Sequence, residues 1–339
     1  MKRLLSISVA ALCCICYGSG KAYLTVKVVD SETAEPVPNI HVRCDFANFS
    51  RGWGIAAKDN RDDASTDAKG ICRLSGFTEA GEASCVARGN AGYYNSGWYS
   101  LHYQERSLLK FGRWLPDNVV VTVRLDRIEN PIPLCVGMLR QLPEHGGRDA
   151  FDDATVVLYD LLKNDWLPPW GLGDVGDVSF SCRKMILGKE PYRYPSGIHT
   201  NEFYRCDVKV SFMGVDNGMI EAIPPDQAGI RLRIAPEGGY ISERVCWAGR
   251  MSRTERKDNF DKNRCYYFRI RAEHDENGQI IRARYGKIYG DFKLVGKEGG
   301  IKGVSFLYYL NPKSNDRNLE WDMTNNLCPN PGDIGEPGP

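Results

Sequence analysis

Apolar and polar residues alternate with a period of two along much of the chain, which is the pattern of β-strands with one buried face. The alternation is clear at 24–29, resumes at 40–44, and is strongest at 119–125, where four aliphatic side chains share one face. Gly70 ends a tight turn between two such runs. Short strands separated by turns, without a helical period, predict an antiparallel β-sandwich over residues 22–126.

The same alternation returns in the second half of the chain. Asn277-Gly278 predicts a hairpin turn, because this pair accepts the positive φ values that a tight turn requires. About eight to ten strands are enough for a second β-rich domain at residues 151–327. Residues 151–163 fit neither a helical nor a strand period, so they are left open between the two. Strands are predicted at 178–182, 208–212, 266–272, 285–295 and 304–310.

The beginning of the chain differs in composition from these strand regions. Residues 1–20 start with Lys2 and Arg3 and continue through an apolar run to small residues, which is the layout of a secretory signal peptide. The apolar run is shorter than the ~20 residues of a membrane span, and no later stretch is long and apolar enough for one. We therefore expect a secreted, periplasmic or cell-envelope protein with no transmembrane segment after signal removal.

Two further segments are poor in strand signals. Residues 127–150 contain Pro131 and Pro133 and are predicted to be a linker between the two domains, because prolines stiffen an extended chain. Residues 328–339 are rich in proline and glycine and are predicted to be a disordered tail.

The charge balance limits the classes of partner. Lysine and arginine number 44, and aspartate and glutamate number 43, for a net charge of +1. Loss of residues 1–20 removes two positive charges and no acid, so the remaining chain stays close to neutral. Proteins that bind nucleic acid usually carry a basic face, so no nucleic-acid partner is predicted.

The number of cysteines is compatible with an oxidising compartment, and their spacing does not indicate a metal site. An exported chain is expected to pair some of its thiols, and an odd number leaves at least one unpaired, but the sequence does not determine the pairing. There is no CxxC and no Cys/His cluster with zinc spacing, so no metal is predicted. Nine cysteines follow residue 20: Cys44, Cys72, Cys85, Cys135, Cys182, Cys206, Cys246, Cys265 and Cys328.

Three motifs in the first domain follow a recognisable order. A polar turn leads into Pro36–Val42, a TDxxG hairpin spans Thr66–Gly70, and a GYY segment lies at Gly92–Tyr94. Together, over about residues 22–126, they resemble the carboxypeptidase regulatory-like domain, a transthyretin-like β-sandwich. The resemblance implies an accessory module without catalytic residues.

The predicted fold class is therefore mainly β: an N-terminal Ig-like or transthyretin-like β-sandwich followed by a larger antiparallel β-sandwich or jelly-roll-like domain. Insertions at 48–63 and 95–114 depart from a minimal domain of the resembled family. Because binding residues concentrate on loops, any binding surface of the first domain is expected there. These insertions hold, among other aromatic residues, Trp53, Trp98, Tyr99 and Trp114.

Carboxylates are the candidate catalytic groups. Glu320 and Asp322 would share a strand face about 7 Å apart, given the ~3.3 Å rise per residue. Asp165, Asp174 and Asp177 lie in a Pro/Gly-rich stretch that could also hold calcium. These five acids support the alternative hypothesis of a secreted hydrolase acting on glycans or peptides, if two of them converge on one cleft. Both stretches are equally typical of turns and strand ends, which is the interpretation that we prefer.

The sequence contains no complete catalytic motif. None of the five histidines has the spacing of a catalytic metal site, and no G-x-S-x-G elbow is present. Residues 171–176 match G-x-G-x-x-G in letters, but no strand precedes them and no helix follows, so no cofactor is predicted.

The preferred hypothesis is an exported, non-enzymatic cell-envelope or extracellular protein with a binding or structural role. Carbohydrate is the candidate ligand and another envelope protein the candidate partner, with a pure scaffold as a third possibility. Sugar C–H faces stack on aromatic rings, so exposed rings are the expected contacts. These candidates are Trp98, Tyr99, Trp114 and Trp170.

Overall fold

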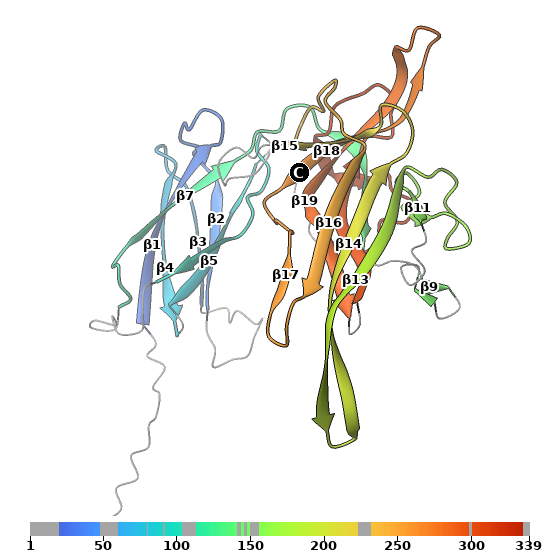
Figure 1. The fold of residues 1–339 in the computed structure, drawn as a ribbon. Coiled ribbons are helices and arrows are strands. Elements are labelled where there is room, and N and C mark those ends of the chain that lie inside the picture. Colours follow the sequence, from blue (N-terminus) through green and yellow to red (C-terminus); the bar gives the residue numbers. More distant parts are fainter. Residues whose placement is uncertain are drawn as a thin grey trace, which may run out of the picture. The chain divides into compact units, whose positions relative to one another are not determined.

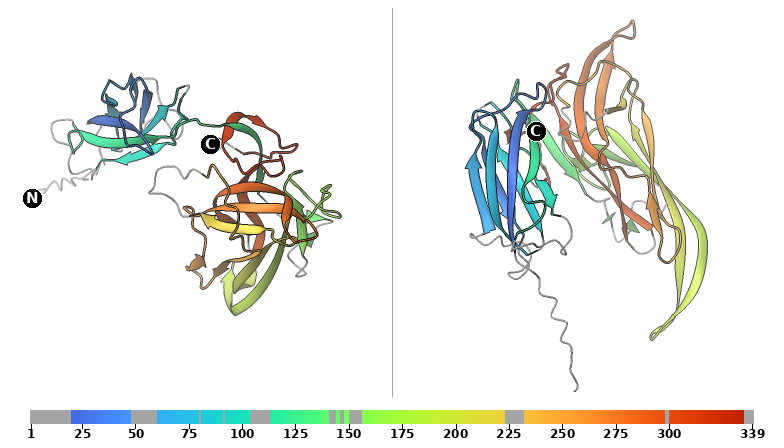
Figure 2. Two further views of the ribbon diagram at one scale, coloured as in Figure 1. Left: turned by 90° about the horizontal axis from the view of Figure 1, so that it is seen from above. Right: turned by 90° about the vertical axis from the view of Figure 1, so that its left-hand side faces the viewer.

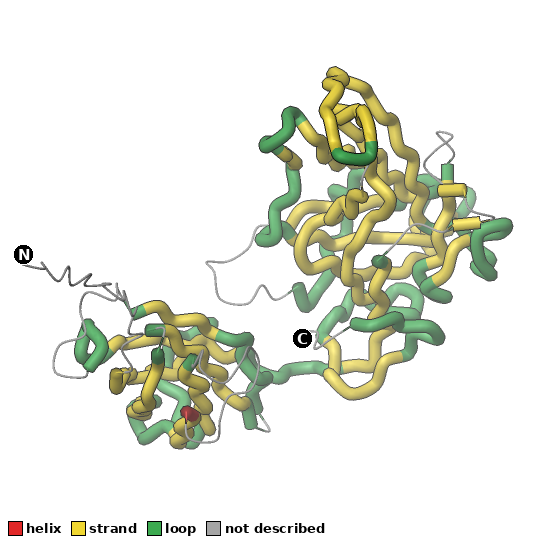
Figure 3. The backbone as a smooth tube through the Cα atoms, turned by 90° about the horizontal axis from the view of Figure 1, so that it is seen from below, coloured by secondary structure: helices red, strands yellow, loops and turns green. Residues whose placement is uncertain are grey.

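The chain forms two compact units, Met1–Ile128 (unit 1) and Glu129–Pro339 (unit 2), and almost all of its regular structure is strand (Figure 3). Residues 1–19, which hold most of the predicted signal peptide, lie outside the described part, as does Trp53. In the described ranges no helical segment has the length and apolar character that a membrane span requires. The computed structural model describes residues 20–47, 60–79, 81–90, 92–103, 113–140, 144–145, 148–149, 156–222, 232–297 and 300–334.

Unit 1 is a two-sheet β-sandwich (Figure 1). One sheet has the strand order β4-β1-β7 and the other β3-β2-β5-β6, and β1 pairs in parallel with β7. Alternate side chains of both sheets meet in one apolar core, which confirms the sandwich predicted from the alternation. The strands are β1 (Gly20–Asp30), β2 (His41–Phe46), β3 (Arg61–Ser65), β4 (Ile71–Thr78), β5 (Glu82–Arg88), β6 (Tyr99–His102) and β7 (Val119–Leu125).

Unit 2 is a larger β-sandwich. Its two six-stranded sheets have the orders β12-β11-β13-β14-β16-β17 and β15-β18-β19-β20-β8-β21 and share the main apolar core, while β9 and β10 form a separate two-stranded ribbon. The strands are β8 (Ile132–Leu139), β9 (Glu144–His145), β10 (Arg148–Asp149), β11 (Val157–Asp160), β12 (Asp165–Trp166), β13 (Val178–Tyr194), β14 (Gly197–Phe212), β15 (Gly218–Ala222), β16 (Glu243–Arg250), β17 (Arg256–Asp258), β18 (Cys265–His274), β19 (Ile280–Lys297), β20 (Gly300–Leu310) and β21 (Trp321–Asn326).

Two sequence-based predictions about the edges of unit 2 are corrected, and one open assignment is partly decided. Residues 132–139, assigned to a linker, form β8, whose residues Leu134, Cys135 and Val136 are fully buried. Cys328, assigned to a disordered tail, is buried, and Leu327 N–H donates to the Leu134 carbonyl at 2.9 Å. Within the ambiguous stretch 151–163, residues 157–160 form a strand, and residues 151–155 lie outside the described part.

The hairpin of β13 and β14 continues beyond the sandwich as a two-stranded arm (Figures 1 and 2). β13 and β14 pair from Val178↔Phe212 to Tyr194↔Gly197, but β16 pairs with β14 only from Tyr204 to Ser211. Residues 187–203, which we name the arm, therefore lack a third strand. The register shifts between Ile186 and Gly188, so a β-bulge marks the root of the arm.

Candidate functional site

A polar pocket in unit 2 is the most site-like cavity among the described residues, with a volume of about 640 Å³. Three segments build it: the β18–β19 hairpin, the loop at 236–240, and the turn after β20. The hairpin turn is closed by Asp275 and Gly278, as the Asn-Gly signal predicts. The side chains that line the pocket include Asp216, Glu237, Tyr240, Arg269, Gln279, Tyr285, Asn315 and Arg317.

Backbone and side-chain hydrogen bonds hold the three segments together. Asn315 has φ of 61°, a conformation that asparagine tolerates well, and its side chain is bonded on both sides to β19. It accepts from Ala283 N–H at 2.9 Å and donates to the Ile281 carbonyl at 2.8 Å. Arg317 donates to the Ala235 carbonyl at 3.0 Å and pairs with Glu237 at 3.0 Å. The turn and the loop are therefore positioned before any ligand arrives.

Two aromatic rings and a buried arginine form the floor of the pocket. The guanidinium of Arg269 lies 4.6 Å from the ring centroid of Tyr240, and the Tyr240 and Tyr285 centroids are 6.5 Å apart. Arg269 is only 5 % exposed because its Nε and Nη1 donate to backbone carbonyls of Asp216 and Glu237. Burial raises the pKa of Tyr240, so its hydroxyl stays protonated and donates to the Pro236 carbonyl at 2.7 Å.

The pocket combines ring faces with charges of both signs and amides. Arg269 and Arg317 supply cationic donors, while Glu237 and Asp216 supply acceptors. A concave surface with aromatic walls and a few fixed polar groups is suited to holding a small polar ligand. The described lining includes no cysteine, serine or histidine that would act as a nucleophile or its base.

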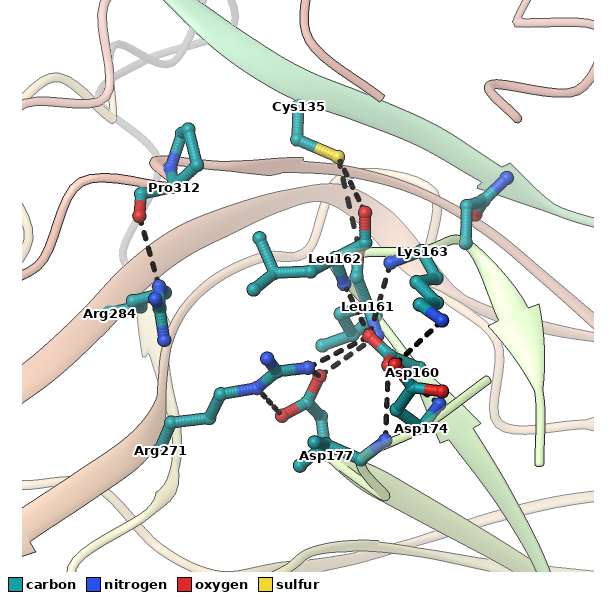
Figure 4. A network of polar contacts seen from close by, with 12 residues as sticks. Cys135, Asp160, Leu161, Leu162, Lys163, Asp174, Asp177, Arg271, Arg284 and Pro312 are labelled. Carbon is teal, nitrogen blue, oxygen red and sulfur yellow. Dashed lines mark hydrogen bonds and ion pairs between the residues drawn. The ribbon is translucent and has the colours of Figure 1, made fainter. Parts of the chain in front are cut away.

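The predicted acids do not converge on this pocket. Asp177 and a residue that sequence reasoning missed, Asp160, instead face Arg271 inside unit 2 (Figure 4). Arg271 Nε and Nη2 donate to the Asp177 carboxylate at 2.8 and 2.9 Å, and Nη2 also donates to Asp160 at 2.8 Å. Asp160 and Asp177 are 1 % and 2 % exposed. The three groups form a closed, buried ion triad rather than an accessible acid pair.

Burial and hydrogen bonding act differently on the two acids of the triad. Burial raises the pKa of Asp177 and outweighs the opposing effect of the Arg271 charge. Burial also acts to raise the pKa of Asp160. Hydrogen bonds from the backbone N–H groups of Val175 and Lys163, together with the Arg271 charge, outweigh burial, so the pKa of Asp160 is lowered. Both carboxylates also accept hydrogen bonds from backbone N–H groups. The triad therefore links β11, the start of β13 and β18 and has a structural role.

The other four candidate acids accept hydrogen bonds from nearby backbone N–H groups or form ion pairs. Asp165 accepts N–H groups of Trp166 and Leu172, and Asp174 pairs with Lys163 at 2.6 Å on the surface. Glu320 is buried and accepts the N–H groups of Glu129 and Asn130 at 2.9 and 2.7 Å.

Asp322 closes its own turn by accepting N–H groups of Thr324 and Asn325. None of the five candidate acids lines the polar pocket. Across the described part of the chain, no group of three or more His, Cys, Asp or Glu side chains is placed to hold a metal ion.

The four aromatic candidates also lie in different surroundings. Trp98 is 51 % exposed, with the Arg43 guanidinium 5.6 Å from its ring centroid. Trp114 is 1 % exposed and its indole N–H donates to the Thr78 carbonyl at 2.9 Å, so the prediction of a surface role for Trp114 is corrected to a core role. Tyr99 is half-buried against the core of unit 1, and Trp170 is half-buried against that of unit 2.

Sequence reasoning missed most of the pocket. It did not single out Tyr240, Tyr285 or Arg269. The Gly238-Gly239-Tyr240 loop and the Asn277-Gly278 turn were the available local signals, but nothing in the sequence places them beside the turn at 312–317.

Comparison with known proteins identifies no family. No family model matches the chain, and no curated protein matches it. The resemblance of residues 22–126 to the carboxypeptidase regulatory-like domain therefore stays a prediction.

Several solved structures are similar at low identity. The major pilin SpaD of Corynebacterium diphtheriae is 8% identical over 79% of this chain and 61% of its own, with a TM-score of 0.25. The shaft pilin SpaA of Lactobacillus rhamnosus GG is 11% identical over 76% and 89%, with a TM-score of 0.21. A 3-chlorocatechol 1,2-dioxygenase of Rhodococcus opacus is 10% identical over 32% and 60%, with a TM-score of 0.25. At these TM-scores the similarities indicate neither fold nor function.

Proposed function

We propose that this protein is an exported, non-enzymatic β-sandwich protein that binds a saccharide in the polar pocket of unit 2. The observation that carries the proposal is the Tyr240–Tyr285 ring pair flanked by Arg269 and Arg317. Sugar rings present C–H faces that pack on aromatic side chains and hydroxyls that bond to charged and amide groups.

The electrostatics of the pocket support a ligand with many hydroxyl groups over a strongly charged one. Arg317 pairs with the Glu237 carboxylate, and Arg269 already donates to the backbone carbonyls of Asp216 and Glu237. The Asp216 and Glu237 carboxylates also line the pocket and would repel a phosphate or sulfate. Hydroxyl groups donate and accept, so they can use the guanidinium and carboxylate edges together.

The experiment is a glycan array probed with the chain from residue 21 onward, followed by calorimetry on the best saccharide. Tyr240→Ala and Gln279→Ala should each lower the affinity at least about tenfold, since each removes a lining side chain. Gln279 is exposed, so its variant tests the pocket without disturbing the core.

The matched control is Trp98→Ala, which removes the most exposed candidate ring of unit 1. It should leave the affinity unchanged. Absence of any saccharide ligand, or loss of binding in Trp98→Ala with full binding in both pocket variants, would overturn the assignment of this pocket.

A further inference from the structure

The described part of unit 2 holds six buried cysteines, all of them free thiols in the structure, and four of them interact as two pairs. The first pair, Cys182 and Cys206, belongs to β13 and β14. In the register of these strands Cys182 is opposite Val208 and Lys184 is opposite Cys206, so the two cysteines are diagonal neighbours. Both side chains point into the main core of unit 2, and the two thiols share a hydrogen bond.

The second pair joins the first strand of unit 2 to the segment after its last strand. Asn326 brackets the backbone of Val136 with two hydrogen bonds, both 2.9 Å long, and Leu327 N–H donates to the Leu134 carbonyl. These bonds hold Cys328 alongside Cys135, and both cysteines belong to the main core. Cys135 Sγ donates to the Leu161 and Leu162 carbonyls at 3.8 Å, and its interaction with the Cys328 thiol is the leading cause that raises its pKa.

We infer that Cys182–Cys206 and Cys135–Cys328 form disulfides in the exported protein, whereas Cys246 and Cys265 remain thiols. Cys246 and Cys265 are also buried, and burial is the leading cause that raises the pKa of each, whereas for Cys182 and Cys135 the leading cause is the neighbouring thiol. The inference rests on the proposed function in one respect, which is that export brings the chain to an oxidising compartment.

The chemistry is thiol–disulfide exchange with a disulfide oxidant, such as an oxidoreductase outside the cytoplasm or oxidised glutathione. One thiol of the pair loses its proton and attacks the oxidant disulfide, forming a mixed disulfide and releasing one thiolate. The second thiolate then displaces the other sulfur of the oxidant. Two cysteine thiols lose two protons and two electrons in total, and the oxidant takes them up as two thiols.

The environment of the first pair favours this exchange. The hydrogen bond from Cys182 lowers the pKa of Cys206 to about 7, despite the opposing effect of burial. A thiol with a pKa near neutrality supplies the thiolate that the exchange requires. All four cysteines are buried, with Cys182 8 % and Cys328 7 % exposed and Cys206 and Cys135 each 1 % exposed.

Each disulfide would add a covalent link beside a part of the fold that is paired over a short length. Cys182–Cys206 lies on the sandwich side of the β-bulge, at the point where the arm leaves the sheet. A two-stranded ribbon has little stability of its own, and its register slips easily without a fixed point. Cys135–Cys328 would tie the C-terminal segment to β8, where the register gives only two strand partners, Trp321↔Ile132 and Asn326↔Leu134.

The test is peptide mapping of the chain from residue 21 onward, refolded in a mixture of reduced and oxidised glutathione and alkylated before digestion with trypsin. Cleavage after Arg183 and Arg205 separates the two cysteines of the first pair, so a disulfide appears as the peptide Cys206–Lys209 joined to one that ends at Arg183. The second appears as Ile128–Arg140 joined to the peptide that begins at Asn318. Alkylated Cys182 and Cys206, or linkage of these four cysteines to other partners, would overturn the inference.

A stability measurement distinguishes a disulfide between Cys182 and Cys206 from two thiols that are only close together. Oxidised wild-type protein should lose on the order of 10 °C in Tm when a reductant is added or when Cys182 and Cys206 are both changed to serine. The matched control is Cys246→Ser, which buries a serine in the same sheet and should leave both cross-linked peptides intact. An equal Tm for the oxidised and reduced wild type would contradict a stabilising disulfide.

The same mapping on protein isolated from its own cells distinguishes the two proposals. Linked peptides there support both export and the pairing. Linked peptides after refolding, together with only thiols in the cellular protein, would overturn export while leaving the pairing in place.

Discussion

The two units of this chain place their polar groups differently. Unit 1 has one apolar cluster built from both sheets, and its described buried polar residues are few: Asp30, Asn60, Thr66 and Thr78. Unit 2 has a main cluster and three smaller ones. Its buried polar residues include the charged side chains Asp160, Asp177, Arg269, Lys287, Asp291 and Glu320.

This difference shows how a sandwich can grow beyond one simple core. In unit 1 the inward positions of each strand are apolar, and burial alone accounts for the pairing of the sheets. In unit 2 the smaller clusters are separated by ion pairs and by rings that face cations, such as Lys287 between Tyr289 and Tyr309 at 4.9 and 4.8 Å. The buried ions specify which segments meet, but each depends on its partners.

The largest expected effect tests that dependence. Arg271→Met removes the shared partner of Asp160 and Asp177 and leaves two acids in the interior without their cation. We expect the free energy of unfolding to fall by about 3–5 kcal/mol, measured by urea denaturation. Arg282→Met is the control, because its pair with Glu273 is about half exposed and should contribute less than about 1 kcal/mol. Equal losses of unfolding free energy in Arg271→Met and Arg282→Met would show that the buried triad contributes no more to stability than an exposed ion pair.

The next effect tests the apolar core of unit 1. Trp114→Phe keeps an aromatic ring but leaves a cavity and removes the donor to the Thr78 carbonyl. The combined cost should be about 2 kcal/mol, and Trp114→Ala should cost about 3–5 kcal/mol. Urea denaturation followed by circular dichroism measures both. A Trp114→Phe variant as stable as the wild type would mean that Thr78 finds another donor and that the core closes around the smaller ring.

The pH dependence of two buried acids should run in opposite directions. In unit 1, hydrogen bonds from the Thr33 backbone and from Arg127 outweigh burial and hold the pKa of Asp30 well below its usual range. The folded state then binds fewer protons than the unfolded one, so the stability advantage over Asp30→Asn is present above about pH 4 and is lost as the pH falls below it. At pH 7 we expect an advantage of about 1–3 kcal/mol.

In unit 2 the pKa of Asp177 is raised by burial, so the folded state binds its proton more readily than the unfolded state does. The stability of the wild type relative to Asp177→Asn should therefore fall as the pH rises above about 4. Denaturation curves of the wild type and both variants between pH 3 and pH 7 test whether stability changes with pH in opposite directions for Asp30 and Asp177. If the stability differences for Asp30→Asn and Asp177→Asn changed with pH in the same direction, this distinction between the units would be wrong.

The smallest effect concerns the surface of unit 1. Trp98→Ala removes an exposed ring whose described contact is with Arg43, and the free energy of unfolding should change by less than about 0.5 kcal/mol. A loss above 1 kcal/mol in a urea titration would show that Trp98 packs more strongly than its exposure indicates.

Local pattern predicts the strands well but not the contacts between distant strands. The runs that became β1, β7 and most of β20 alternate cleanly, so their buried faces follow from the sequence. β8 resembles a linker in sequence because Pro131 precedes it and Pro133 lies inside it. Its consecutive residues Leu134, Cys135 and Val136 are all buried, which removes the alternation.

The sites depend on the long-range contacts that such patterns do not contain. Asp160 and Arg271 are 111 positions apart, and only the pairing of the sheets brings them together. The candidate acids were chosen for their closeness in sequence, yet a nearby backbone N–H or lysine satisfies most of them. The pocket likewise joins three turns whose individual signals describe turn geometry alone.

In both units the first and last strands are neighbours that run in parallel: β1 beside β7, and β8 beside β21. Tension applied to the two ends of a unit therefore pulls these neighbours along their length in opposite directions. Their hydrogen bonds are then loaded in shear and must rupture together, whereas strands of a terminal hairpin would peel apart one bond at a time. The register gives β1 and β7 seven residue pairs and β8 and β21 only two, so the mechanical strength of this arrangement belongs chiefly to unit 1.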